Sequence, residues 1–252
     1  ITEDAYIPVW GTYITTPSVN EKFAKVNVRT KVVLPEGADP AKYSMETSVW
    51  NPNKQKLTAV RTSLAQMKYN NNQAEQEFVI QAPSLWSPEM PALYSAETRL
   101  YEGDKLKDIY TTPFGIRSIE IIPDKGFFLN GKRTVFKGVC NHHDLGPLGA
   151  AVNDAAIRRQ IRILKDMGCN AIRTSHNMPA PELIRACDEM GMMIMAESFD
   201  EWNVAKCKNG YNLLFDEWAE KDLVNLLHNF RNNPSVVMWC IGNEAVSYTH
   251  LR

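Results

Sequence analysis

The sequence lacks both a net charge of either sign and any long apolar run. Over 252 residues, 28 basic residues almost balance 29 acidic ones, so no broad basic surface indicates a nucleic acid or an anionic membrane as a partner. No apolar stretch reaches the roughly 20 residues of a membrane-spanning helix, and residues 1–4 do not resemble the start of a signal peptide. We therefore expect no nucleic-acid partner and no membrane partner.

Cysteine is scarce, and its distribution does not suit a disulfide framework. The chain has five cysteines, all in its second half and without a Cys-x-x-Cys pair. An odd number of cysteines in a chain of this length favours small, buried, free thiols. The residues concerned are Cys140, Cys169, Cys187, Cys207 and Cys240.

The first half of the chain, up to about Thr112, is predicted to form β-strands. Residues 25–33 alternate between two faces, with Val26, Val28 and Thr30 on one of them. Each such strand has one apolar face that a second sheet must cover, so the pattern favours a β-sandwich. Further strands, separated by clusters of Pro, Gly and Asn, are expected at residues 43–50, 77–81, 93–101 and 106–112.

After Pro123 strands alternate with helices about every 30 residues, which is typical of βαβ units. Gly168 and Gly191 occupy helix C-cap positions, and Pro181 suits a first helical turn. No Gly-x-Gly-x-x-Gly follows a strand, which disfavours a nucleotide-binding sheet and favours the first half of a (β/α) barrel. We expect strands at residues 134–139, 170–173, 192–196 and 235–241, and helices at 154–167, 181–190 and 216–230.

Polar side chains follow each of these four strands, and the active site of a (β/α) barrel lies at this end of its strands. Glu244 follows an apolar strand, and Gly242 allows the backbone to approach its neighbours closely. A partly desolvated carboxyl there would have the raised pKa of a general acid; a solvated glutamate that ends a strand is an equally weighted alternative. The polar segments are residues 140–144, 173–177, 197–202 and 242–244.

Two features of these segments have competing interpretations. Trp202 is either a platform on which a sugar ring stacks or part of the core, and its charged surroundings favour the platform. A metal site at His142, His143, Asp144 and His176 is the less favoured alternative to sugar binding. Adjacent histidines rarely bind one ion, and no His-x-x-x-His pair is present.

Several motifs, in order and properly spaced, resemble glycoside hydrolase family 2, which includes β-galactosidases, β-glucuronidases and β-mannosidases. The resemblance implies an immunoglobulin-like β-sandwich over residues 1–117, followed over residues 118–245 by the first four strands of a (β/α)8 TIM barrel. Residues 85–88 and 91–94 resemble the sandwich, 114–117 its junction with the barrel, and 128–132 the hairpin that opens the barrel. Residues 137–139 with His142, 173–176 and 241–244 resemble three successive strand-end motifs.

The family resemblance also implies a retaining glycosidase that works by double displacement. Glu244 corresponds to the acid/base, and Asn243 to the residue that binds the sugar 2-hydroxyl. His142, Arg173 and His176 correspond to pocket residues around the bound sugar. Trp202, from its surroundings alone, is added to the expected substrate-binding residues. Three positions depart from the usual family pattern, because Asn177-Met178 replaces Tyr-Pro and Ala196 replaces an acidic residue.

Cofactor and substrate are also expectations from the resemblance. Some members of the family bind magnesium beside the acid/base, in the region of Glu201. Asn203 stands where those members have a histidine ligand, so we expect no required cofactor and no metal ligand, with a bound magnesium ion as the less favoured alternative. Residues 199–202 and 146–149 most resemble the β-galactosidase-like branch, which favours terminal β-galactosides; a β-glucuronidase or β-mannosidase of the same family is the alternative.

The nucleophile of this family is a glutamate on a later barrel strand, which this chain does not contain. We therefore expect a chain truncated at both ends, inactive alone, with residues 246–252 as a non-native tail. A non-catalytic carbohydrate-binding or interaction module, with the sandwich as its working part, is the alternative from a different class. Homo-oligomerisation stays open, and the resemblance favours a bacterial periplasmic or secreted enzyme.

Overall fold

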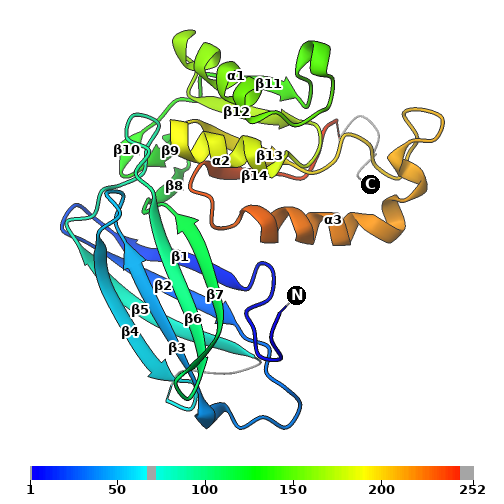
Figure 1. Ribbon diagram of the computed structural model, residues 1–252. Coiled ribbons are helices and arrows are strands. Elements are labelled where there is room, and N and C mark those ends of the chain that lie inside the picture. The colour runs from blue at the N-terminus through cyan, green and yellow to red at the C-terminus, as the bar shows by residue number, and fades with distance from the viewer. Residues whose placement is uncertain (1, 67–71, 245–252) are drawn as a thin grey trace. The chain divides into compact units, whose positions relative to one another are not determined.

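The computed structural model describes residues 2–66 and 72–244. The chain forms two compact units, Ile1–Arg133 and Thr134–Arg252 (Figure 1). The sequence places the domain boundary earlier, between residues 117 and 118. Residues 118–133 belong with the first unit, where the Asn130 side chain accepts from the Ser118 N–H and donates to the Trp86 carbonyl, both over 3.0 Å. The tail expected at residues 246–252 lies outside the described residues.

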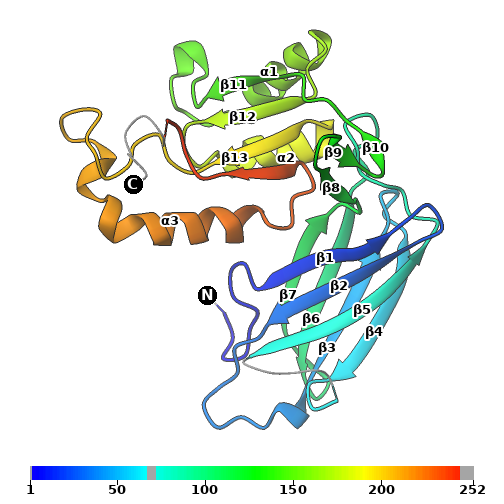
Figure 2. The ribbon, with the colours of Figure 1, turned by 180° about the vertical axis from the view of Figure 1, so that it is seen from behind.

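The first unit contains two antiparallel sheets and a smaller third one. Figure 2 shows the three-stranded sheet in front of the four-stranded one. The three-stranded sheet has the order β1 (Thr12–Val19), β2 (Phe23–Lys31), β5 (Gln73–Gln81). The four-stranded sheet has the order β4 (Lys56–Ser63), β3 (Tyr43–Trp50), β6 (Tyr94–Glu102), β7 (Lys105–Phe114).

A shared core between these two sheets makes the first unit a β-sandwich, as the sequence predicts. Val26 and Val28 of β2 are buried, together with Phe78 of β5. They belong to one apolar cluster with Val49 of β3 and Phe114 of β7. The cluster joins strands from both sheets, so each sheet covers the apolar face of the other.

Two strands of the sandwich were not expected from the sequence. β4 lies at the edge of its sheet, and most of its side chains are exposed, including Leu57 and Val60. β1 contains Pro17, and its pairing with β2 shifts register between Thr15 and Ser18. Neither strand shows the clean alternation of a half-buried strand, which explains why periodicity did not identify them.

The third sheet of the first unit contains the hairpin expected at residues 128–132. Its order is β10 (Lys132–Arg133), β9 (Gly126–Leu129), β8 (Ile119–Ile122), and all pairs are antiparallel. Asn130 and Gly131 form the turn between β9 and β10, both with positive φ, which these two residue types tolerate.

The second unit has a parallel four-stranded sheet whose spatial order equals its chain order. This order, with one helix after each of the first three strands, is that of a partial (β/α) barrel. The strands are β11 (Gly138–His142), β12 (Ala171–Ser175), β13 (Met193–Glu197) and β14 (Val236–Cys240), and the helices are α1 (Asp154–Asp166), α2 (Pro181–Met190) and α3 (Phe215–Phe230).

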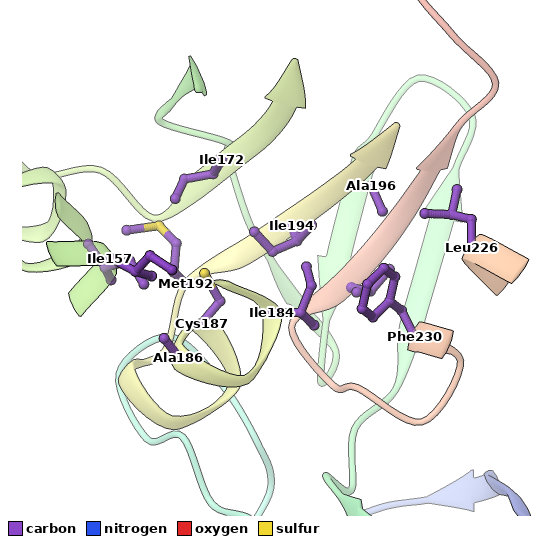
Figure 3. Close-up of a cluster of buried hydrophobic side chains, with 12 residues drawn as sticks. Ile157, Ile172, Ile184, Ala186, Cys187, Met192, Ile194, Ala196, Leu226 and Phe230 are labelled. Atoms are coloured by element: carbon purple, nitrogen blue, oxygen red, sulfur yellow. The ribbon is translucent and has the colours of Figure 1, made fainter. Parts of the chain in front are cut away.

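All three helices pack on one face of this sheet. Figure 3 shows their apolar side chains meeting those of the strands. Ile157 of α1, Ile184 of α2 and Phe230 of α3 share one buried cluster with Ile172 of β12 and Ile194 of β13. Because side chains alternate along a strand, the neighbours of Ile172 and Ile194 point to the opposite face, where barrel-type sites are built.

The helices begin and end where their local sequence predicts. Asn153 caps α1 by accepting from the Ala156 N–H over 3.0 Å, and Pro181 occupies the first turn of α2. Gly191 ends α2 in the left-handed conformation, and its N–H bonds to the Cys187 carbonyl. In the described ranges, no helix combines the length and hydropathy needed to cross a membrane.

The strand expected at residues 134–139 was placed too early; β11 begins at Gly138. The segment before β11 is held by the Asn170 side chain and not by pairing with a neighbouring strand. This side chain accepts from the Lys137 N–H over 2.8 Å and donates to the Val135 carbonyl over 2.9 Å. The apolar run thus precedes the strand, which instead extends to His142. At Gly138 an added Cβ would lie 2.5 Å from the Ala171 carbonyl oxygen, so glycine permits the close pairing with β12.

Candidate active site

The C-terminal ends of the four parallel strands bring the predicted site residues to one edge of the sheet. β11 and β12 pair in register, with Cys140 opposite Arg173 and His142 opposite Ser175. β12 and β13 place Arg173 opposite Met195. Arg173 therefore lies on the face opposite the helices, with Glu197 two residues further along β13 than its partner Met195.

Glu197 is the centre of the site, although the sequence did not single it out. Its side chain is fully buried, and the Arg173 guanidinium donates to its Oε1 over 2.7 Å. His176 Nδ1 lies 3.1 Å from Oε2, and the Glu197 N–H donates to Thr174 Oγ1 over 3.0 Å. The hydrogen bond to Glu197 raises the pKa of Arg173, so one buried carboxylate fixes the side chains of two predicted pocket residues.

Asn243 is held by neighbours from β12 and from the segment that follows β13. Its side-chain oxygen accepts from Arg173 over 3.2 Å, and its Nδ2 donates to Asp200 Oδ1 over 3.1 Å. Its backbone N–H donates to the Phe199 carbonyl over 2.8 Å. Both ends of the amide are thereby assigned, and its plane is fixed.

Glu244 lies beside this network, and its side chain is half exposed. The ammonium of Lys206 lies 3.2 Å from its Oε2 and 2.9 Å from Asp200 Oδ1. Glu244 is thus linked to Asn243 through Lys206 and Asp200. The sequence instead predicts that Glu244 shares one pocket with His142, Arg173 and His176.

Asp200 and Lys206 were both overlooked in the sequence, and they form a charged pair. Burial raises the pKa of Asp200, but hydrogen bonds from Lys206 and Asn243 outweigh burial and hold this pKa below its ordinary value. Burial lowers the pKa of Lys206, and the bonds to Asp200 and Glu244 reverse that effect and raise it. Both groups are therefore charged at neutral pH.

Trp202 packs beneath the end of β14. Its indole N–H donates to the Asn243 carbonyl over 2.8 Å, and its ring lies 5.8 Å from that of Phe215, between centroids. At Gly242 an added Cβ would lie 2.8 Å from this indole and 2.7 Å from the Phe199 carbonyl oxygen. The close backbone approach expected at Gly242 is therefore present, and it seats Trp202 directly under Asn243.

The histidines of the first two strand ends separate into two groups. The rings of His142 and His176 meet edge to face, with centroids 5.1 Å apart. His143 instead pairs its Nε2 with the Ala150 carbonyl over 2.9 Å, and the Asp144 carboxylate accepts from the Gly146 N–H. Within residues 2–66 and 72–244, no three His, Cys, Asp or Glu side chains form a group that could hold a metal ion.

Glu201 does not face the site as a free ligand. It is nearly fully buried, and its Oε1 accepts the backbone N–H groups of Lys206 and Cys207. Its Oε2 accepts from the Asn212 N–H over 3.1 Å. The bond from Lys206 is the largest cause of a lowered pKa at Glu201, so this ionised carboxylate closes the loop of residues 201–212.

A cavity of about 400 Å³ opens beside the charged pair. Its walls include Asp200 and Tyr211, together with Asn177 and Met178 from the end of β12. The Tyr211 hydroxyl donates to Asp222 over 2.5 Å, and burial raises the pKa of this tyrosine. Both polar and apolar side chains line the cavity, the latter including Met178 and Phe199.

Comparison with known proteins assigns both units to one family. Residues 6–117 match the family model described as glycosyl hydrolases family 2, and residues 120–252 match its TIM barrel domain. The chain belongs to glycoside hydrolase family 2. This confirms the immunoglobulin-like sandwich and the opening half of a TIM barrel that the sequence motifs predicted.

Relatives within family 2 include a β-galactosidase and a putative β-glucuronidase. A β-galactosidase of Bacteroides ovatus is 44% identical over 94% of this chain, and a putative β-glucuronidase of Formosa agariphila is 36% identical over 93%. A crystal structure of a family 2 member from Bacteroides cellulosilyticus matches 96% of this chain and 31% of its own, with a TM-score of 0.88 and 37% identity. The chain spans 28% and 22% of the lengths of the two relatives.

Proposed function

We propose that this chain carries the acid/base half of the active site of a retaining glycoside hydrolase, with Glu244 as the acid/base. The observation that carries the proposal is the convergence of three strand ends on one network. Arg173 of β12 contacts both Glu197 of β13 and Asn243 beyond β14. A carboxylic acid follows this network in the next residue, Glu244, at the edge of the sheet where barrel enzymes perform their chemistry.

Double displacement requires two carboxylates about 5–5.5 Å apart, one on each side of the scissile bond. In the first step Glu244 protonates the leaving oxygen while the nucleophile attacks the anomeric carbon. In the second step the Glu244 carboxylate takes a proton from water, which releases the sugar. Glu197 does not suit the role of nucleophile, because it is buried and its two oxygens are engaged by Arg173 and His176. We place the nucleophile on a later strand, outside this chain.

The remaining site residues bind the sugar. Asn243 uses one Nδ2 hydrogen for Asp200, which leaves the other to donate to the sugar 2-hydroxyl. His142 and His176 provide ring nitrogens for neighbouring hydroxyls, since their edge-to-face contact sets the direction of both rings. Trp202 is half buried, and its indole supports Asn243 while the open part of the ring offers a stacking surface.

A terminal β-galactoside is the substrate that we favour. Support comes from residues 199–202 and 146–149, which resemble the β-galactosidase-like branch, and from the relative of Bacteroides ovatus, a β-galactosidase. A β-glucuronide is the alternative, because two relatives are named putative β-glucuronidases. A glucuronidase needs a cationic clamp for the substrate carboxylate.

The test uses the reading frame extended to its natural ends. We expect it to contain a second strand-end glutamate and to hydrolyse an aryl β-galactoside faster than the glucuronide or mannoside. Glu244→Gln should lower kcat/KM by about 10²–10⁴-fold, with partial rescue by azide, whereas Glu220→Gln, an exposed substitution on α3, should have no effect. A natural stop without a second glutamate, or a fully active Glu244→Gln, would contradict the proposal.

A further inference from the structure

One lysine forms ion pairs with both Asp200 and Glu244, beside the proposed reaction. The Lys206 ammonium lies 2.9 Å from Asp200 Oδ1 and 3.2 Å from Glu244 Oε2. Its side chain is only 18% exposed, although it belongs to a surface loop. Because a long lysine side chain loses rotamer freedom on burial, this position is maintained by the ion pairs that it makes. It stands beside the acid/base as a fixed positive charge.

The residues around Glu244 do not fit the magnesium ion that some members of the family bind beside the acid/base. Magnesium prefers six oxygen ligands in octahedral geometry. Both oxygens of Glu201 accept backbone N–H groups of its own loop, so their lone pairs point at donors. Asn203 provides no imidazole, and its side chain is exposed. The remaining carboxylates, Asp200 and Glu244, share an ammonium group that would repel a cation.

We propose that Lys206 is a positioning residue for Glu244 and Asn243, and that its ammonium makes a divalent cation unnecessary at this site. The inference rests on the proposed function. Lys206 acts on Glu244 directly through the 3.2 Å ion pair. It acts on Asn243 through Asp200, whose Oδ1 is the acceptor for both Lys206 and Asn243 Nδ2. Proton donor and sugar-binding amide are therefore aligned by the same side chain.

The loss of activity on removing Lys206 should depend on the leaving group of the substrate. Without the ammonium, the carboxylates of Asp200 and Glu244 repel each other, so Glu244 turns away from the leaving oxygen. Protonation matters most when the leaving alcohol is a poor leaving group, and little when it is a dinitrophenolate. A residue that only supports the fold would lower turnover of both substrates alike, which separates positioning from a structural role.

The activity experiment compares three variants of the extended protein. For a methyl or disaccharide β-galactoside, Lys206→Met is expected to lower kcat/KM, which reports the first step, at least tenfold, with a smaller loss of kcat/KM for the dinitrophenyl galactoside. Lys206→Arg should recover most of the kcat/KM for the poor leaving group. Lys208→Met changes an exposed lysine of the same loop and should match the wild type. Equal losses on both substrates, or equal rates for Lys206→Met and Lys208→Met, would overturn the positioning role.

The inference that no divalent cation is needed at this site is tested by a binding measurement that does not depend on activity. Titration calorimetry with MgCl₂ on the extended protein should give no binding that depends on Glu201, so wild type and Glu201→Gln should behave alike. Magnesium binding that disappears in Glu201→Gln would overturn the inference even if the enzyme is active. An extended protein that hydrolyses no β-glycoside would refute the proposed function, while the calorimetry would still decide whether the ammonium has replaced a cation site.

Discussion

Arg173 and Glu197 form a 2.7 Å ion pair in which the carboxylate has no exposure to solvent. The pair crosses from β12 to β13, so it ties together two neighbouring strands at their C-terminal ends. Removing one partner of such a pair leaves an uncompensated buried charge, and this costs more than the pair itself contributes.

Arg173→Ala should therefore destabilise the chain strongly. We expect a loss of about 3 kcal/mol, because Glu197 is left charged and buried with only His176 as a polar partner at its Oε2. Urea unfolding followed by circular dichroism measures the change. Arg159→Ala, at an exposed position on α1, should stay within about 0.5 kcal/mol of wild type. Similar unfolding midpoints for the two variants would show that the ion pair is dispensable.

Gly242→Ala should destabilise the site through a steric contact. The added Cβ would lie 2.7 Å from the Phe199 carbonyl oxygen and 2.8 Å from the Trp202 ring, and forcing atoms into a packed region costs about 1–3 kcal/mol. Gly168→Ala is the matched control, since Gly168 has a φ of +88° but nothing within 4 Å of an added Cβ. Both variants lower the unfolding midpoint, and the Gly242 variant should fall further. A larger effect at Gly168 would contradict the packing argument.

The loop of residues 201–212 should lose protection in acid. The pKa of Glu201 is lowered in the folded state, chiefly by the Lys206 N–H. Its stabilising effect is therefore complete above the ordinary glutamate pKa of about 4.3, and it is lost as the pH falls through the lowered value. Hydrogen exchange at the amides of Lys206 and Asn212, corrected for intrinsic rates, should accelerate below about pH 4.

The control for this pH effect is a substitution at the same carboxylate. Glu201→Gln should raise exchange at pH 7 and remove the acid-dependent step, whereas Glu220→Gln on α3 should change neither. If protection at Lys206 and Asn212 were constant down to pH 3, the ionised carboxylate would not be what closes the loop.

The five cysteines should differ sharply in reactivity. All are free thiols in the structure, Cys140 and Cys207 are exposed, and Cys187 is fully buried in α2. Burial raises the pKa of Cys187 well above its ordinary value, so little thiolate is present to react. Mass spectrometry after brief treatment with a thiol reagent at pH 8 should find label at Cys140 and Cys207, and at Cys187 only after denaturation. Rapid native labelling of Cys187 would mean that α2 opens readily.

The sequence predicted the elements whose boundaries depend on local chemistry. Pro181 and Gly191 define α2 to the residue, because a first-turn proline and a left-handed C-cap act on their own backbone. The prediction failed where a residue far along the chain determines the bounds of an element. Residues 134–139 are mostly apolar, yet Asn170 binds the backbone of Val135 and Lys137, and β11 begins only at Gly138.

The site residues divide in the same way, into those that local sequence predicts and those that depend on distant parts of the chain. Asn243 and Arg173 were found because they follow strands in recognisable motifs, and they do meet in space. Glu197 was visible at the end of β13, but one glutamate among several has no local mark that it is buried between an arginine and a histidine. Lys206 lies in a loop without periodicity, and only the folded path of that loop brings its ammonium to Asp200 and Glu244.

The loop of residues 201–212 has a part that the Glu201 carboxylate fixes and a part that is exposed. The buried carboxylate accepts from the backbone of Lys206 and Asn212, while residues 203–205, between Trp202 and Lys206, are exposed. Variation at those exposed positions leaves the anchoring bonds untouched. The loop can therefore vary in sequence at residues 203–205 while Trp202 keeps its bond to Asn243 and Lys206 its ion pairs with Asp200 and Glu244.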